Sequence, residues 1–186
     1  MRFFPAANRI AAFNLFLRRS IVWPLMTEKD YNECVTNYAD GLYRFLLKTV
    51  RQKADAEDMV QSAFEVLWKN RAQVQPETAK AYLFKVGYNK MIDHFRKQKR
   101  VDLFESFEGH ERPVEAKGHN LKDVLNAALE RLSEQNRSLV LLKDYEGYSY
   151  EEIGVITGLN AAQVKVYLHR SRLQLRDYLV AIENLV

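Results

Sequence analysis

Apolar residues recur at intervals of three and four along most of this 186-residue chain, the spacing that places them on one face of an α-helix. In the first half this spacing predicts helices over residues 31–49, 54–71 and 77–98. Thr27 and Glu28 are a candidate cap for the first helix, and Pro76 is a candidate start for the third. The helical spacing resumes at Leu121 and continues to the end of the chain, with Ser133 as a further cap. The sequence therefore predicts an all-α protein.

Two capping signals and a glycine divide residues 149–176 into two helices joined by a tight turn. Ser149 followed by Glu152 is a capping box, which begins a helix. Gly158 ends that helix, because glycine adopts the left-handed conformation at little steric cost. Asn160 followed by Gln163 then begins the second helix by similar logic. This arrangement predicts a helix-turn-helix, whose second helix can enter the major groove of DNA.

The second helix of this motif has one apolar and one basic face. Val164, Leu168 and Ser171 lie on the side that is predicted to face inward. No acidic residue occurs between Gln163 and Arg176, and the outer side carries the basic residues Lys165, His169, Arg170, Arg172 and Arg176. The pattern favours DNA binding over the alternative, an ordinary helical hairpin with a solvated basic face.

The early and late turns of this helix are expected to contact different parts of DNA, because recognition helices use their first turns for bases and flanking cations for phosphates. Gln163 and Lys165 are the candidate base readers, since Gln pairs well with adenine and Lys with guanine. The later arginines are expected to neutralise phosphates. The alternative for Arg170 is an ion pair with an acid of its own domain, Glu151 or Glu152.

The predicted helix at residues 77–98 mixes aromatic and basic side chains. Residues 80–100 contain seven Lys or Arg and one acid, Asp93. Phe84, Tyr88 and Phe95 lie near one line on such a helix. Aromatic rings stack on unpaired bases while cations hold the phosphates around them, so the combined set favours nucleic-acid binding. For each aromatic taken singly, burial in the core is the favoured alternative.

Composition divides the chain into four parts. Residues 1–25 hold four arginines and no acid, and they do not resemble a secretory signal. We expect them to be an N-terminal extension without a fixed fold; a short amphipathic helix packed on the body is the alternative. Residues 26–100 and 121–186 are the two predicted helical domains. Residues 101–120 hold five acids, two glycines and a proline without helical periodicity, and predict a flexible acidic linker.

Overall charge and cysteine content limit the function only weakly. The net charge is +4, but it comes from residues 1–25, since the rest of the chain has 28 − 4 = 24 basic and 24 acidic residues. The single Cys34 excludes an internal disulfide and is typical of a reducing cytosol. Asp55 and Asp58 could be metal ligands of an enzyme, but no second acidic or histidine cluster completes such a site. We therefore expect no metal, cofactor or catalytic residue.

Three segments together carry a resemblance to a known family. Residues 55–70, DAEDMVQSAFEVLWKN, resemble the core helix of bacterial sigma factor region two. Residues 81–98 resemble the promoter-melting and −10-reading segment that follows it, and residues 132–176 resemble region four, which reads the −35 element. Two such domains joined by a short linker, with no middle domain, resemble the extracytoplasmic-function (ECF) class. The resemblance covers about residues 30–180.

This resemblance implies a cytoplasmic, non-catalytic transcription initiation factor. Its implied partners are the β and β′ subunits of core RNA polymerase, promoter DNA that it helps to melt, and an anti-sigma factor. The residues implied to meet the β′ clamp helices are Asp58, Gln61 and Glu65. Those implied to hold the −10 strand are Tyr82, Lys85, Tyr88, Asn89, Asp93, Arg96 and Lys97. Those implied to meet the −35 element are Ala162, Gln163, Lys165, Val166, His169, Arg170 and Arg172.

The chain departs from the family pattern at two places. Val166 and Tyr167 replace the usual small-then-basic pair, and Gly87 and Tyr88 replace what is commonly Ala-Arg. The alternative function is a stand-alone helix-turn-helix regulator, which would bind promoter duplex without polymerase. That alternative leaves the aromatic-basic helix and the polar face of residues 55–61 unexplained.

Overall fold

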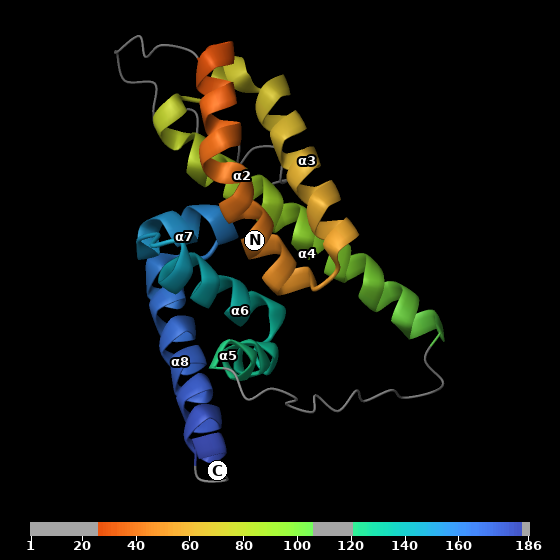
Figure 1. Cartoon of the computed structure of the whole chain (residues 1–186), viewed down its shortest axis with the longest axis vertical. Helices are drawn as coiled ribbons and strands as arrows, with labels where there is room; N and C mark the ends of the chain where they lie inside the picture. The colour runs from red at the N-terminus through yellow and green to blue at the C-terminus, as the bar shows by residue number, and fades with distance from the viewer. Residues whose placement is uncertain (1–25, 106–120, 184–186) are drawn as a thin grey trace, which may run out of the picture.

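The computed structural model describes residues 26–105 and 121–183, and every regular element in these two ranges is helical. The first domain consists of α2 (Glu28–Val50), α3 (Lys53–Lys69) and α4 (Ala79–Glu105), with the short 3₁₀ turns η1 (Arg71–Gln73) and η2 (Pro76–Thr78) between the last two (Figure 1). The second consists of α5 (Leu121–Glu130), α6 (Glu134–Val140), the π-helical turn η3 (Leu141–Tyr145), α7 (Tyr150–Thr157) and α8 (Ala161–Glu183). The all-α prediction is confirmed.

The two ends of α4 differ from the approximate range predicted for this helix. The segment opened by Pro76 begins as a 3₁₀ turn rather than as α-helix, because α4 starts only at Ala79. At its other end α4 continues to Glu105, five residues into the range predicted as linker. The predicted N-terminal extension and residues 106–120 of the predicted linker lie outside the described residues. None of the described helices is long and apolar enough to cross a membrane.

Side-chain caps mark the starts of α2 and α6. Thr27 accepts a hydrogen bond from the backbone N–H of Asp30, whose carboxylate accepts one from the Thr27 N–H at 2.8 Å, so α2 begins with a capping box. Ser133 caps α6 as predicted. These bonds satisfy N–H groups that have no partner within the helix.

The two domains share a continuous hydrophobic core, and α4 is the element that joins them. This helix packs on α2 and α3 of its own domain and on α7 of the second domain (Figure 1). Phe84 lies at the centre, with its ring centroid 5.6 Å from that of Phe45 in α2 and 5.4 Å from that of Tyr148 before α7. Because Phe84 is fully buried between these rings, both domains contribute to the same core.

A buried arginine makes the polar contacts at the junction. Arg137 of α6 is 4% exposed and donates four hydrogen bonds to backbone carbonyls. Two of the acceptors, Leu129 and Glu130, are the last residues of α5, and Leu132 lies in the turn that follows it; the fourth, Thr49, lies in the last turn of α2. Helix C-termini leave carbonyls unpaired and attract positive charge, so this guanidinium serves two helix ends from two domains.

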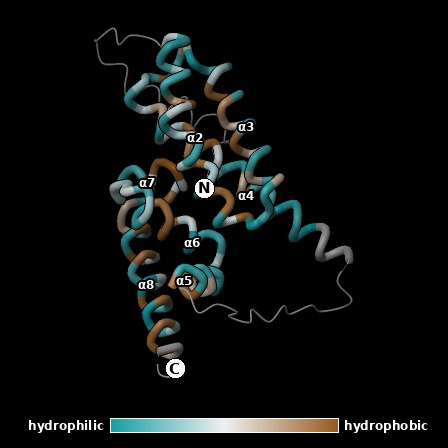
Figure 2. The backbone as a smooth tube through the Cα atoms, viewed as in Figure 1, coloured by the Kyte–Doolittle hydropathy of each residue, from teal (hydrophilic) through white to brown (hydrophobic). Residues whose placement is uncertain are grey.

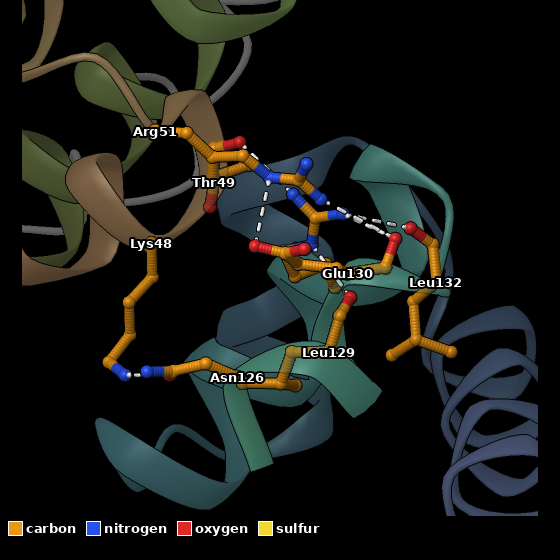
Figure 3. Close-up of polar contacts among 8 residues, drawn as sticks. Lys48, Thr49, Arg51, Asn126, Leu129, Glu130 and Leu132 are labelled. Carbon is orange, nitrogen blue, oxygen red and sulfur yellow. Dashed lines mark hydrogen bonds and ion pairs between the residues drawn. The ribbon is translucent and has the colours of Figure 1, made fainter. Parts of the chain in front are cut away.

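Two further polar pairs link the two domains (Figure 3). Lys48 donates to the side-chain oxygen of Asn126 at 3.2 Å, and Arg51 lies 3.8 Å from the Glu130 carboxylate. Burial lowers the pKa of Arg137 to about 10, so the group is still protonated at neutral pH. The junction is thus formed by an apolar centre with hydrogen-bonded and ion-paired side chains next to it.

The turn between α7 and α8 is closed by two glycines. The Ser149–Glu152 capping box begins α7, and Gly158 ends it in the left-handed conformation at φ 79°. A Cβ on Gly154, inside α7, would lie 2.7 Å from the carbonyl oxygen of Leu159. The turn can therefore fold back closely only because position 154 lacks a side chain. The predicted helix-turn-helix is present, with the predicted capping residues.

Replacing Arg137 with methionine should lower the free energy of unfolding by roughly 2–4 kcal/mol, because buried carbonyls of α2 and α5 lose a charged donor. Urea unfolding of the full chain measures this. Arg44→Met is the matched control, since Arg44 forms an exposed pair with Asp40 on the surface of α2; we expect a change below about 1 kcal/mol. Equal losses in the two variants would contradict the role assigned to Arg137.

Alanine substitutions at two helical glycines should change stability in opposite directions. Gly154→Ala should destabilise the chain by about 1–3 kcal/mol, since the new methyl group meets the Leu159 backbone. At Gly41 in α2 the nearest atom is a Glu146 carboxylate oxygen at 3.4 Å, an ordinary contact. Gly41→Ala should therefore stabilise by up to about 1 kcal/mol through helix propensity alone. Thermal unfolding of both variants tests the signs.

Candidate nucleic-acid interface

The outward face of α8 carries all the residues that were predicted for −35 DNA. Val164, Leu168 and Ser171 are buried against the second domain, as predicted. Brown and teal segments alternate along α8 in Figure 2, as expected for a helix with one buried and one exposed face. The exposed residues include Ala162, Gln163, Lys165, Val166, His169, Arg170 and Arg172. The structure therefore brings this predicted set together on one accessible surface.

Two arginines of this face already have carboxylate partners. Arg172 binds Asp144 of η3 through two nitrogen atoms, with Nη2–Oδ1 and Nε–Oδ2 distances of 2.5 and 3.3 Å. Arg176 makes a similar pair with its neighbour Asp177 at 2.8 Å. Hydrogen bonding to Asp144 raises the pKa of Arg172. The guanidinium of Arg172 is thus oriented from η3 before any DNA arrives.

Arg170 differs from Arg172 in this respect. The alternative prediction paired Arg170 with Glu151 or Glu152, but among the described residues no ion pair links Arg170 to an acid. Glu152 instead accepts a hydrogen bond from the backbone N–H of Ser149 at 2.8 Å. The exposed guanidinium of Arg170 is therefore available for a phosphate, while Arg172 has the contact within its own domain.

Gln163 is engaged in the cap of its own helix. Its backbone N–H donates to Asn160 Oδ1 at 2.8 Å, and its side-chain Oε1 accepts from the Asn160 backbone N–H at 3.0 Å. The predicted cap is confirmed. A glutamine that pairs with adenine uses both its oxygen and its nitrogen, so base reading by Gln163 would require release of this cap.

A second exposed stripe runs along α4. Positions three and four apart lie on one face of a helix, and the spacing therefore aligns Tyr82, Lys85, Asn89, Asp93 and Arg96. Asn89, Asp93, Arg96 and the adjacent Lys97 are exposed, whereas Tyr82 and Lys85 are half-buried. Arg96 donates to Asp93 at 3.0 Å. Partial burial raises the pKa of Tyr82 and lowers that of Lys85.

Tyr88, which the family resemblance implied among the −10 residues, is buried, as was favoured for each aromatic taken singly. Tyr88 is 5% exposed, and burial raises its pKa. Its neighbours on the helix surface are Phe84 and Met91, both fully buried, and Phe95 is half-buried beside His94. The aromatic line identified in the sequence is the core-facing side of α4, and the stripe that begins at Tyr82 is the accessible side.

The polar face of α3 lies opposite a complete core stripe. Asp58, Gln61 and Glu65 are exposed, and Gln61 Nε2 donates to Glu65 Oε1 at 3.2 Å. The buried residues of the same helix are Ala56, Met59, Ala63, Phe64 and Leu67. The polar stripe of Asp58, Gln61 and Glu65 therefore does not contribute to the core and is available to a partner.

Metal binding finds no support in residues 26–105 and 121–183, where no three His, Cys, Asp or Glu side chains are grouped to hold an ion. Asp55 instead lies 3.6 Å from His94 Nε2 of α4.

The sequence reasoning missed Asp144, the partner of Arg172, because a contact across 28 residues has no periodic signal. It also missed Arg137, whose position before the apolar run of residues 139–142 was the only available sign of burial.

Comparison with known proteins identifies both domains. A model of the Sigma-70 region 2 family matches residues 34–101, and one of the Sigma-70, region 4 family matches residues 122–175. The chain is 30% identical over 158 residues to the RNA polymerase sigma factor CarQ of Myxococcus xanthus, covering 82% of this chain and 91% of the relative. It is 31% identical over 140 residues to the RNA polymerase sigma factor SigV of Bacillus subtilis, covering 74% of this chain and 84% of that relative.

A further relative and two solved structures are also similar to this chain. The chain is 34% identical over 159 residues to the ECF sigma factor SigE of Mycolicibacterium smegmatis, a match that covers 81% of this chain and 62% of the relative's length. In fold it is similar to the sigma factor RpoE of Bartonella quintana, at a TM-score of 0.67 and 24% identity over 81% of this chain and 97% of that one. It is also similar in fold to CnrH, with a TM-score of 0.61 and 23% sequence identity. That match covers 94% of this chain and 98% of CnrH.

These similarities favour a sigma factor over the alternative, a stand-alone helix-turn-helix regulator. The region 2 match accounts for the first domain, which a stand-alone helix-turn-helix regulator would leave unexplained. Sigma factors are non-catalytic subunits of RNA polymerase, so the expectation that the chain is not an enzyme is confirmed by its family. The chain belongs to the ECF-type RNA polymerase sigma factors with Sigma-70 regions 2 and 4, which direct the polymerase to promoters.

Proposed function

We propose that this sigma factor uses three separate surfaces for polymerase, the −10 element and the −35 element. The observation that carries the proposal is the division of α3, α4 and α8 into a core face and an accessible polar face. In each helix the accessible face holds most of the residues that the family resemblance implies. Each surface can therefore bind a partner while the core behind it stays packed.

The polymerase surface is the stripe of Asp58, Gln61 and Glu65 on α3. These side chains are exposed, and the hydrogen bond between Gln61 and Glu65 favours one arrangement of the stripe. Its two carboxylates suit a basic partner surface, and the β′ clamp helices of core polymerase are the proposed partner. Electrostatic complementarity of this kind favours fast and specific association.

The −10 surface is the stripe of α4 that begins at Tyr82. Its exposed members supply an amide, a carboxylate and two cations: Asn89, Asp93, Arg96 and Lys97. The cations can hold the phosphates of a melted strand, and Tyr82 and Lys85 lie at the edge of the stripe. We assign Tyr88 a supporting role, because its ring packs in the core beneath this surface.

The −35 surface is the outward face of α8. Lys165 lies in the second turn, where side chains reach base edges, and Arg170 lies one turn later. Lys165 is the proposed guanine reader. Arg170 is the proposed phosphate contact, because its guanidinium is exposed. Arg172 is a second phosphate contact whose direction is set by Asp144.

A protein inhibitor is the further partner that we propose. The RpoE structure is a complex with the anti-sigma factor NepR, and the CnrH structure is a complex with the cytosolic domain of CnrY. An anti-sigma factor of this chain would bind it in the cytoplasm, where core polymerase is found, and would compete for the surfaces described above.

Asp58→Arg should weaken assembly with core polymerase more than about tenfold, the effect of a 1.4 kcal/mol loss at a contact. The position is exposed, so the helical circular dichroism spectrum should not change. Glu77→Arg is the control, because it makes the same charge reversal at an exposed position outside α3. If both variants co-purify with polymerase as the wild type does, α3 is not the polymerase surface.

Lys165→Ala and Arg170→Ala should have different effects on promoter binding by the reconstituted holoenzyme. Lys165→Ala should cost about 1–3 kcal/mol and relax the preference at one −35 position. Arg170→Ala should weaken binding to all promoters alike. It should also lower the slope of log affinity against log salt concentration by about one. A −35 substitution library assayed over a salt series separates these effects. The reverse pattern would exchange the two roles.

A further inference from the structure

Val166 is an unusual residue at the centre of the DNA-facing surface of α8. Its side chain is 46% exposed, although valine is normally buried. Its four nearest positions on the helix surface, three and four residues away, are Ala162, Gln163, His169 and Arg170, and all four are exposed. The buried face, formed around Val164, lies on the opposite side. Val166 therefore projects directly away from the protein.

Neither packing nor helix propensity accounts for a valine at this position. Val166 does not join the hydrophobic core of the described residues, whereas the next residue, Tyr167, packs against it. β-Branched side chains lose rotamer freedom in helices, so an exposed helical site gains nothing from valine. An explanation has to come from what this face contacts.

The neighbours of Val166 determine which part of the groove it would meet. Lys165 and Arg172 lie on one flank, and Arg172 is oriented by Asp144. Arg170 lies on the other flank, one turn toward the C-terminus, and Gln163, whose oxygen is held in the helix cap, lies one turn toward the N-terminus. Arg172 and Arg170, one on each flank, are the proposed phosphate contacts, so the apolar centre between them faces the base edges.

Only one base edge in the major groove offers an apolar partner. Thymine carries a C5 methyl group there, while the other bases present only hydrogen-bond donors and acceptors. We propose that Val166 contacts the C5 methyl group of a thymine in the −35 element and makes this sigma factor prefer thymine at that position. The small side chain of Ala162, one turn earlier, leaves room for the helix to approach. This inference rests on the proposed role of α8 in −35 binding.

Deoxyuridine provides a direct test, because it retains every hydrogen-bonding group of thymine and lacks only the methyl group. Holoenzyme reconstituted with the full chain is assayed on a promoter mapped from its transcript start sites. Each thymine of the −35 element, on either strand, is replaced in turn. One replacement should weaken binding by the wild type about fourfold, the factor that burial of one methyl group supplies.

The same replacement should have no effect on Val166→Ala, which has already lost the contact. Val180→Ala is the matched control: Val180 lies on the same helix, is 48% exposed, and lies far from the first turns, so this variant should respond as the wild type does. Val166→Ala should also bind the unmodified promoter several-fold more weakly than Val180→Ala, again through loss of methyl contact.

Two results would overturn the assignment of Val166. In the first, deoxyuridine replacement weakens binding by the wild type and by Val166→Ala equally at every thymine. In the second, no deoxyuridine replacement weakens binding by the wild type, although thymine-to-cytosine changes still do. A different result would refute the proposed role of α8 itself. In that case scrambling the whole −35 element would leave binding unchanged, and neither Lys165→Ala nor Arg170→Ala would weaken it.

Discussion

The burial of Phe84 between Phe45 and Tyr148 is the contact on which the rest of this structure depends. It places α4 in the core of both domains at once, so that regions 2 and 4 form one packed body. Because one side of α4 is used in this way, only its opposite side can carry the polar stripe from Tyr82 to Arg96. The burial of one side of α4 therefore limits the proposed −10 surface to the opposite side.

Polar groups determine how the two regions fit together around that ring. Lys80 of α4 lies 3.7 Å from the largely buried Glu146 carboxylate and 4.8 Å from the centre of the Tyr148 ring. At the other end of the junction Arg137 satisfies carbonyls from α2 and α5. An apolar contact tolerates sliding, whereas a buried charge is costly in any arrangement that leaves it unpaired. These groups therefore select one relative orientation of the two regions.

The surface of α8 is organised differently from that of α4. The stripe on α4 is polar along its exposed length, as suits a single strand held mainly through its backbone. The face of α8 instead has an apolar centre at Val166 with cations on both flanks. A duplex groove offers phosphates at its edges and base edges in its floor, so the two patterns suit two forms of DNA.

The sequence by itself determined the helices, their caps and the helix-turn-helix, because these depend on residues three or four apart. Ser149 with Glu152, Gly158, and Asn160 with Gln163 all act over such distances, and the outward face of α8 followed from its periodicity. Only the tertiary structure decided that Tyr88 is buried, that Arg172 pairs with Asp144 and that Arg137 joins two helix ends. Each of these depends on a neighbour brought close by folding. An aromatic side chain can pack in a core or stack on a base, and an arginine can serve a core, an ion pair or a phosphate. Periodicity shows that a helix has two faces, but the packing of the other helices determines which face is covered.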